Sequence, residues 1–234
     1  MNFIKYLKKI IPENILFFLK KKFFSKKQYF GLNKLDKKVL KYLNYNRGFF
    51  VELGANDGIS QSNTLHFEKY KDWKGILIEP IKFKYDQCVS VRSKKNIFFN
   101  CACVSKDYLK KKINLIYSDL RSVTIDPKNL VVPNQHINSD DLNIYQTHKE
   151  YSVEARTLNS LFIESQCPEI MDFLSLDTEG YEIEILKGMN FNEYRFKFML
   201  IESRNIEALV NFLQKKNYQL IDKFSKHDYL FKMI

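Results

Sequence analysis

Acidic side chains recur where short apolar runs of this sequence end. Glu79, Asp177 and Glu202 each follow directly after such a run, and Glu52 lies inside another. Carboxylates can accept hydrogen bonds from ligand hydroxyls, take a proton from a reacting group, or bind a cation. So many acids are unusual for a phosphate site, because like charges repel. The pattern therefore favours a hydroxyl-rich or cationic ligand.

The apolar run that contains Glu52 leads into a segment that suits a tight turn. Glycine permits sharp turns and close backbone approach, and the chain has only seven glycines. The segment matches neither G-x-G-x-x-G nor the phosphate-binding G-x-x-x-x-G-K-[ST] pattern. An ordinary turn between a strand and a helix is the alternative. We predict that this segment is a ligand-binding loop. Its candidate binding residues are Glu52, Gly54, Ala55, Asn56, Asp57 and Gly58.

Glu79 is a candidate ligand for a nucleoside. It ends the second apolar run, 25 residues after Gly54. A carboxylate at this spacing can accept hydrogen bonds from both ribose hydroxyls in Rossmann-type folds. The alternative is a solvated surface acid. Cys101 and Ala102 lie at the end of the next predicted strand and are assigned to the same cofactor site.

The segment from Ser175 to Glu182 carries the candidate catalytic groups. Asp177 is the first candidate for a general base, and Glu179 is a further catalytic candidate in this segment. Glu202, at the end of the following predicted strand, is another. The acids after Asp177 could instead favour a helix N-terminus through the helix dipole. Asp177 and Glu202 could also hold Mg²⁺, which would lower the pKa of an acceptor hydroxyl.

Short apolar strands that alternate with helical patterns predict an α/β fold with a mostly parallel sheet. In such sheets, ligands bind outside the carboxyl ends of the strands, where the acids listed above fall. A lysine-rich hairpin is predicted around 109–117. The predicted strands are 49–53, 75–78, 96–101, 173–176, 198–201, 218–221 and 229–233, and the predicted helices are 33–42, 63–70, 81–92, 180–187 and 206–216.

The stretch 118–150 is polar and irregular, and we expect it to cover the acceptor site. It contains three secondary catalytic candidates, namely His136, His148 and the Asp140-Asp141 pair. The four histidines form no metal-type cluster along the sequence, and no nucleophile motif is present. The four cysteines lack zinc-site spacing and suggest reduced thiols.

The charge of the chain is concentrated at its N-terminus. Residues 1–30 contain eight lysines and one acid, Glu13, which accounts for +7 of the net charge of +11. This uneven charge distribution predicts a basic amphipathic extension over residues 1–30 and one domain over residues 31–234. A nearly neutral domain argues against a nucleic-acid partner. No signal peptide or membrane-spanning run is apparent, so a cytoplasmic protein is expected.

Apolar residues of the extension recur at helical spacing between lysines. A basic amphipathic segment can bind an anionic membrane surface, which would place the protein at the inner face of the membrane. The alternative is a helix that packs on the domain while its lysines are solvated.

Three longer stretches together resemble the FkbM-type methyltransferases. They are FVELGANDGISQSNT over 50–64, WKGILIEP over 73–80 and DFLSLDTEGYEIEILKG over 172–188. The resemblance runs from about residue 48 to 203. It implies the class I methyltransferase fold, a Rossmann-like sheet of seven strands with an antiparallel C-terminal hairpin. It also implies S-adenosylmethionine as methyl donor and O-methylation, often of a sugar, so the expected partner is a glycan or small-molecule acceptor.

Two other classes of protein are kept as alternatives. One is a nicotinamide-dependent oxidoreductase on a similar fold, which the altered glycine pattern and the nearby acids disfavour. The other is a non-catalytic, membrane-associated binding module, which the acids at the strand ends disfavour.

Overall fold

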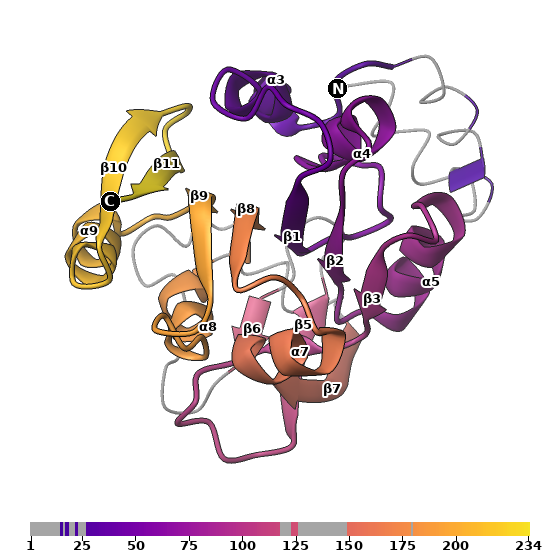
Figure 1. Ribbon diagram of the computed structural model, residues 1–234. Coiled ribbons are helices and arrows are strands. Elements are labelled where there is room, and N and C mark those ends of the chain that lie inside the picture. The colour runs from indigo at the N-terminus through magenta and orange to yellow at the C-terminus, as the bar shows by residue number, and fades with distance from the viewer. Residues whose placement is uncertain are drawn as a thin grey trace.

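The computed structural model describes residues 15, 17, 18, 22, 27–117, 123–125, 149–178 and 180–234. Its centre is a seven-stranded sheet in the order β10-β11-β9-β8-β1-β2-β3 (Figure 1). The five strands from β9 to β3 in this order are parallel, and β11 runs antiparallel to both β9 and β10. The strands are β1 (Phe49–Leu53), β2 (Lys74–Ile78), β3 (Ile97–Phe99), β8 (Ile170–Leu176), β9 (Arg195–Glu202), β10 (Tyr218–Lys223) and β11 (Asp228–Met233).

Helices cover both faces of this sheet. The helices are α3 (Leu35–Val39), α4 (Leu65–Lys71), α5 (Lys82–Val91), α7 (Leu158–Ser165), α8 (Glu182–Lys187) and α9 (Ile206–Gln214), with a short 3-10 helix η1 (Leu32–Lys34) before α3. Successive strand side chains point to opposite faces. Val51 therefore packs in a core with α7, α8 and α9, whereas Phe50 packs with α3 and α4 on the other face (Figure 1).

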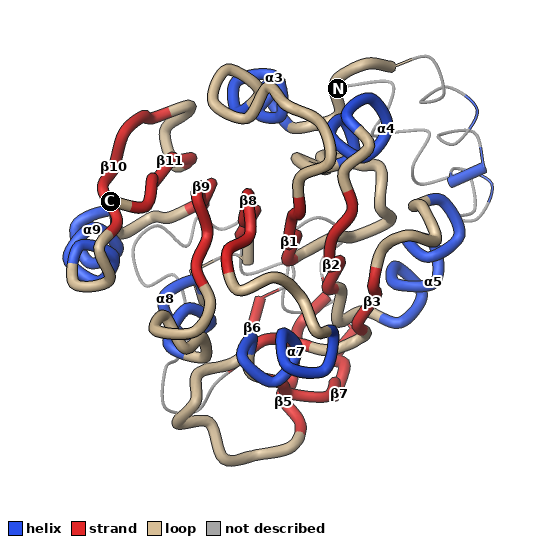
Figure 2. The backbone as a smooth tube through the Cα atoms, viewed as in Figure 1, coloured by secondary structure: helices blue, strands red, loops and turns tan. Residues whose placement is uncertain are grey.

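A second, four-stranded sheet in the order β4-β7-β5-β6 lies in the chain between β3 and α7. Its strands are β4 (Ala102–Cys103), β5 (Lys112–Tyr117), β6 (Val123–Ile125) and β7 (Lys149–Arg156). Figure 2 shows β5, β6 and β7 as a group apart from the central strands and close to α7. The strands β5 and β7 pair antiparallel from Lys112 with Glu154 to Tyr117 with Lys149.

The structure confirms the predicted fold class. The sheet is mostly parallel, has seven strands, and ends in the antiparallel pair β10–β11. The second sheet differs from the sequence prediction, because β5 pairs with β7 as well as with β6. The sequence did not predict the strand β7 or the helix α7 that follows it. The other differences are at boundaries: α3 is shorter than predicted, and β8 and β9 each begin three residues earlier.

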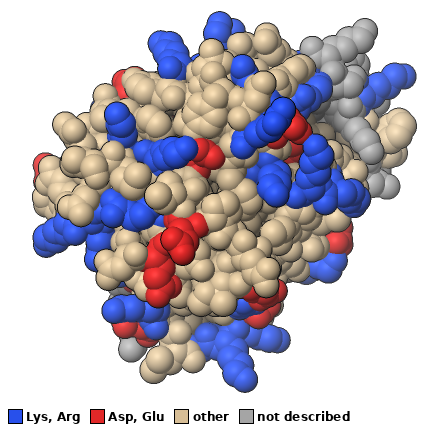
Figure 3. All heavy atoms as spheres, viewed as in Figure 1, with Lys and Arg blue, Asp and Glu red and all other residues tan. Residues whose placement is uncertain are grey.

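Charges of both signs are interspersed over the face of the molecule in Figure 3, where acidic groups lie between Lys and Arg side chains. Within the described part of the chain, none of the helices has the length and apolar character needed to cross a membrane.

Candidate active site

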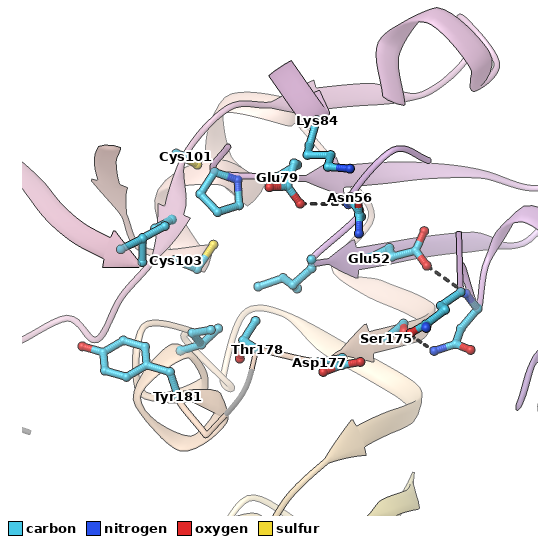
Figure 4. Close-up of a pocket in the computed structure, with 18 of the residues that line it drawn as sticks. Glu52, Asn56, Glu79, Lys84, Cys101, Cys103, Ser175, Asp177, Thr178 and Tyr181 are labelled. Carbon is cyan, nitrogen blue, oxygen red and sulfur yellow. Dashed lines mark hydrogen bonds between the residues drawn. The ribbon is translucent and has the colours of Figure 1, made fainter. Parts of the chain in front are cut away.

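A cavity lies at the carboxyl ends of β1, β2 and β8 (Figure 4). Residues that were predicted from separate sequence motifs lie together in the lining of this cavity. The predicted residues that line the cavity are Glu52, Gly54, Asn56, Glu79, Cys101, Ala102 and Asp177. The predicted residues that do not line it are Ala55, Asp57, Gly58 and Glu202.

Gly54 allows two strand ends to meet. Its φ of 75° is in the left-handed region, and a Cβ at this position would lie 2.7 Å from the carbonyl oxygen of Asp177. Glycine is therefore required at this position by the close approach of the Asp177 backbone, whether or not a ligand is bound. Asp57 also acts within the chain, because its carboxylate accepts hydrogen bonds from the backbone N–H groups of Ile59 and Ser60 at 3.0 and 2.6 Å.

Glu52 is buried, and its carboxylate is bound by the loop that follows β1. It accepts hydrogen bonds from the Asn63 N–H at 2.9 Å and the Thr64 hydroxyl at 2.6 Å. Arg92 reaches the same carboxylate with Nη1 at 3.1 Å and Glu68 with Nε at 2.8 Å. Burial would lower the pKa of Arg92, but the carboxylates of Glu68 and Glu52 raise it, so the guanidinium stays charged. These contacts favour a positioning role for Glu52, and its direct contact with a cofactor stays a prediction.

Glu79 lies at the end of β2 with its carboxylate in the cavity wall (Figure 4). One carboxylate oxygen accepts the N–H of Asn56 at 2.8 Å and the other accepts the N–H of Ile81 at 2.9 Å. Each oxygen keeps a second lone pair. Burial raises the pKa of Glu79 to about 7, although these two N–H groups and the charge of Lys84 act in the opposite direction.

The polar groups around Glu79 fit the nucleoside and amino-acid parts of S-adenosylmethionine. The carboxylate of Glu79 has acceptor capacity for ribose hydroxyls. The Asn56 side-chain oxygen is buried in the same wall and has no hydrogen-bond donor among the described residues. A buried acceptor of this kind needs a donor. The α-ammonium of an amino-acid moiety is a donor of the right charge.

Asp177 follows β8, is exposed, and faces the cavity together with Thr178 (Figure 4). The buried carboxylate of Glu182 fixes this turn, since one of its oxygens accepts the N–H groups of Thr178 and Gly180 at 3.1 and 2.9 Å. Burial raises the pKa of Glu182, and these donors partly offset that rise. Four predicted candidates lie outside the described residues: Glu179, His136, His148 and Asp140-Asp141.

The magnesium hypothesis finds no support in the described residues. Among them, no three His, Cys, Asp or Glu side chains come close enough to form a metal site. Asp177 faces the cavity, whereas Glu202 lies outside it, at the end of β9 opposite Asp228 of β11. Leu176 of β8 pairs with Ile201 of β9, so Asp177 and Glu202 follow paired positions of neighbouring strands, yet only Asp177 lines the cavity.

Sequence reasoning missed several residues of the cavity. Lys84 lies one turn into α5, so its position after Glu79 could have suggested it. Leu115 and Tyr117 come from β5, whose contact with the cavity depends on the second sheet. Cys103 also lines the cavity, and all four cysteines are free thiols.

The mostly parallel sheet and the cavity at its carboxyl edge define a Rossmann-like α/β domain. Residues 52–231 match the family model of the methyltransferase FkbM domain. This match extends over most of the chain, so the chain belongs to the FkbM methyltransferase family, which confirms the resemblance. Family membership implies S-adenosylmethionine as the cofactor. No curated protein matches the sequence significantly.

Several solved methyltransferase structures resemble this chain at low sequence identity. Methyltransferase FkbM from Methylobacillus flagellatus KT is 15% identical, with a TM-score of 0.47, and the match covers 80% of this chain but only 43% of that one. A methyltransferase from Geobacter sulfurreducens is 10% identical, with a TM-score of 0.45 and coverage of 98% and 94%. Precorrin-6y C5,15-methyltransferase from Geobacter metallireducens GS-15 is 9% identical, with a TM-score of 0.39 and coverage of 88% and 94%. Likenesses this distant do not inform the substrate.

Proposed function

We propose that this protein is an S-adenosylmethionine-dependent O-methyltransferase that acts on a sugar hydroxyl of a glycan or glycoconjugate precursor. The observation that carries the proposal is the shared cavity of Glu79 and Asp177, which come from the ends of β2 and β8. One acid suits the ribose of the cofactor, and the other can take the proton of an acceptor hydroxyl.

The residues around the cavity have separable roles in this proposal. When bound, S-adenosylmethionine supplies the methyl group. Glu79 accepts hydrogen bonds from the ribose, and Asn56 accepts one from the amino group. Asp177 is the proton acceptor, which Glu182 holds in place through the backbone of the following turn. Orientation of the acceptor oxygen supplies much of the rate, so this turn must be rigid.

Calorimetry and a mass-shift assay test the proposal together. The full chain should bind S-adenosylmethionine and not NAD, which separates methyl transfer from the oxidoreductase alternative. Incubation with candidate nucleotide sugars, glycans and lipid-linked sugars should yield S-adenosylhomocysteine and a product heavier by one methylene. Cofactor binding without turnover on any acceptor would favour the non-catalytic alternative.

We further propose that residues 1–30 make peripheral contact with an anionic membrane surface, at the inner face of the membrane. In the described part of this segment, Phe17 packs against the cluster of Phe30, Ile59 and Leu65, whereas Ile15 and Phe18 are exposed. Exposed apolar side chains among lysines suit an anionic lipid surface.

Co-sedimentation with vesicles tests this contact. The full chain should bind phosphatidylserine vesicles and not phosphatidylcholine vesicles, and salt should weaken the binding. Phe18→Ser should reduce binding without lowering the melting temperature, since Phe18 is 68% exposed. Equal binding by wild type and variant, or none by either, would contradict the proposal.

A further inference from the structure

The second sheet supplies one wall of the cavity. Along β5, Ile113, Leu115 and Tyr117 point to the same face, because strand side chains alternate. Ile113 and Leu115 are buried in the main core, and Tyr117 packs against that core while it lines the cavity. The inner face of an inserted sheet therefore meets the carboxyl edge of the central sheet.

The ring of Tyr117 contacts two other aromatic rings. Phe83 of α5 meets it edge to face, with ring centroids 5.3 Å apart and an interplanar angle of 85°. Tyr151 of β7 meets it in the same manner at 6.1 Å. Such aromatic pairs prefer defined geometries, so the ring is positioned before a ligand arrives. A ring fixed in a cavity wall is suited to pack against another flat or gently curved surface.

Further apolar residues of the cavity come from α8 and the residue before it. Tyr181 and Ile185 are buried and line the cavity, and Asp177 lies close by along the chain (Figure 4). Leu115, Tyr117, Tyr181 and Ile185 thus form an aromatic and aliphatic wall, which we name the apolar wall. By contrast, Glu79 and Asn56 form a polar wall at the ends of β2 and β1.

We propose that Tyr117 is the platform of the acceptor subsite and packs against the C–H face of a pyranose ring. This inference rests on the proposed function. The face of an aromatic ring carries negative charge density, which attracts the weakly positive C–H groups of a sugar. A binding site of this kind pairs an apolar surface with a few polar groups that fix orientation, here the carboxylate of Asp177.

The rival occupant of the apolar wall is the adenine of the cofactor, which also stacks on aromatic rings. Two substitutions in the full chain separate these occupants. Tyr117→Leu removes the ring, and Tyr117→Phe keeps it while removing the hydroxyl. Tyr70→Leu, on the exposed part of α4, is the matched control for loss of a tyrosine ring. Melting temperatures verify that each variant is folded.

Binding is measured by calorimetry for S-adenosylmethionine and by saturation-transfer NMR for methyl α-D-glucopyranoside, galactopyranoside and mannopyranoside with S-adenosylhomocysteine present. At least one glycoside should receive saturation at its ring C–H protons. Tyr117→Leu should weaken its binding roughly tenfold and leave the affinity for S-adenosylmethionine within about twofold of wild type. Tyr117→Phe and Tyr70→Leu should both behave as wild type.

Each other result overturns a defined part of the inference. If Tyr117→Leu weakens S-adenosylmethionine binding and not glycoside binding, the ring belongs to the adenine site. If no glycoside binds to wild type, or Tyr117→Leu binds it equally well, the platform is wrong. Failure of wild type to bind S-adenosylmethionine would instead overturn the proposed function, so the two failures are distinguishable.

Discussion

The two walls of the cavity are built by different kinds of interaction. The polar wall is fixed by hydrogen bonds, since Glu79 is bound by two backbone N–H groups. Glu52, which also lines the cavity, is bound by Arg92 and the loop after β1. The apolar wall is fixed by packing and ring contacts, which join Tyr117 to Phe83 and Tyr151. Directional hydrogen bonds suit the cofactor, whose polar groups are the same in every reaction cycle. An apolar surface tolerates acceptors of different shape.

Arg92→Met should have the largest effect, which is on the stability of the fold. It removes a cation from the buried network around Glu52 and Glu68. It leaves Glu52 and Glu68 buried without their cation, so the free energy of unfolding should fall by about 3–5 kcal/mol. Urea denaturation measures the change. Lys82→Met is the control, since the exposed Lys82–Asp86 pair should contribute less than about 1 kcal/mol. Similar losses in both variants would contradict the buried network.

Asp177→Asn tests the proposed proton acceptor in the cavity. The substitution keeps the shape of the side chain but removes the proton acceptor, so turnover should fall roughly 100-fold while cofactor affinity is unchanged. Formation of S-adenosylhomocysteine and calorimetry give the two values. A rate that is sensitive to EDTA and restored by Mg²⁺ would assign a metal role instead. Wild-type turnover in the variant would remove Asp177 from catalysis.

Glu79→Ala tests the polar wall with a smaller effect. Loss of a carboxylate that accepts hydrogen bonds from ribose should weaken S-adenosylmethionine binding by about 1–3 kcal/mol. Calorimetry on the folded variant measures it, and the affinity for the acceptor should not change. An unaltered dissociation constant for the cofactor would show that Glu79 is not one of its ligands.

The raised pKa of Glu79 predicts a modest pH dependence of cofactor binding. Since burial raises this pKa to about 7, the ionised form, which is the better acceptor, develops only as the pH rises through that value. Affinity for S-adenosylmethionine should therefore increase from about pH 6 to about pH 8, and Glu79→Gln should lose this increase. A flat profile in wild type would contradict the raised pKa.

The same shift has the opposite effect on folding. A carboxyl whose folded pKa is raised stabilises the folded state below its ordinary pKa, and this contribution is lost as the pH rises through about 7. Denaturation of wild type and Glu79→Gln between about pH 4.5 and about pH 7 should show wild type losing stability relative to the variant as the pH rises. The opposite slope would be inconsistent with a buried Glu79.

Local sequence determined the central sheet and the acids at its edge. The runs at β1, β2, β8 and β9 are short, apolar and separated by helical patterns, so both their strand identity and the position of Glu79 and Asp177 could be predicted. Gly54 was also predictable as a turn, because few glycines are present and the position follows a strand.

Only the tertiary structure decided which residues share the cavity. Glu52 lies inside its apolar run and lines the cavity, but its carboxylate is bound by the loop 60–64 and by Arg92, which is 40 residues away in the chain. Tyr117 joins the site because β5 pairs with β7, a strand that begins more than thirty residues later. Hydrophobic periodicity reports which face of an element is buried, but pairing between distant segments sets what that face contacts.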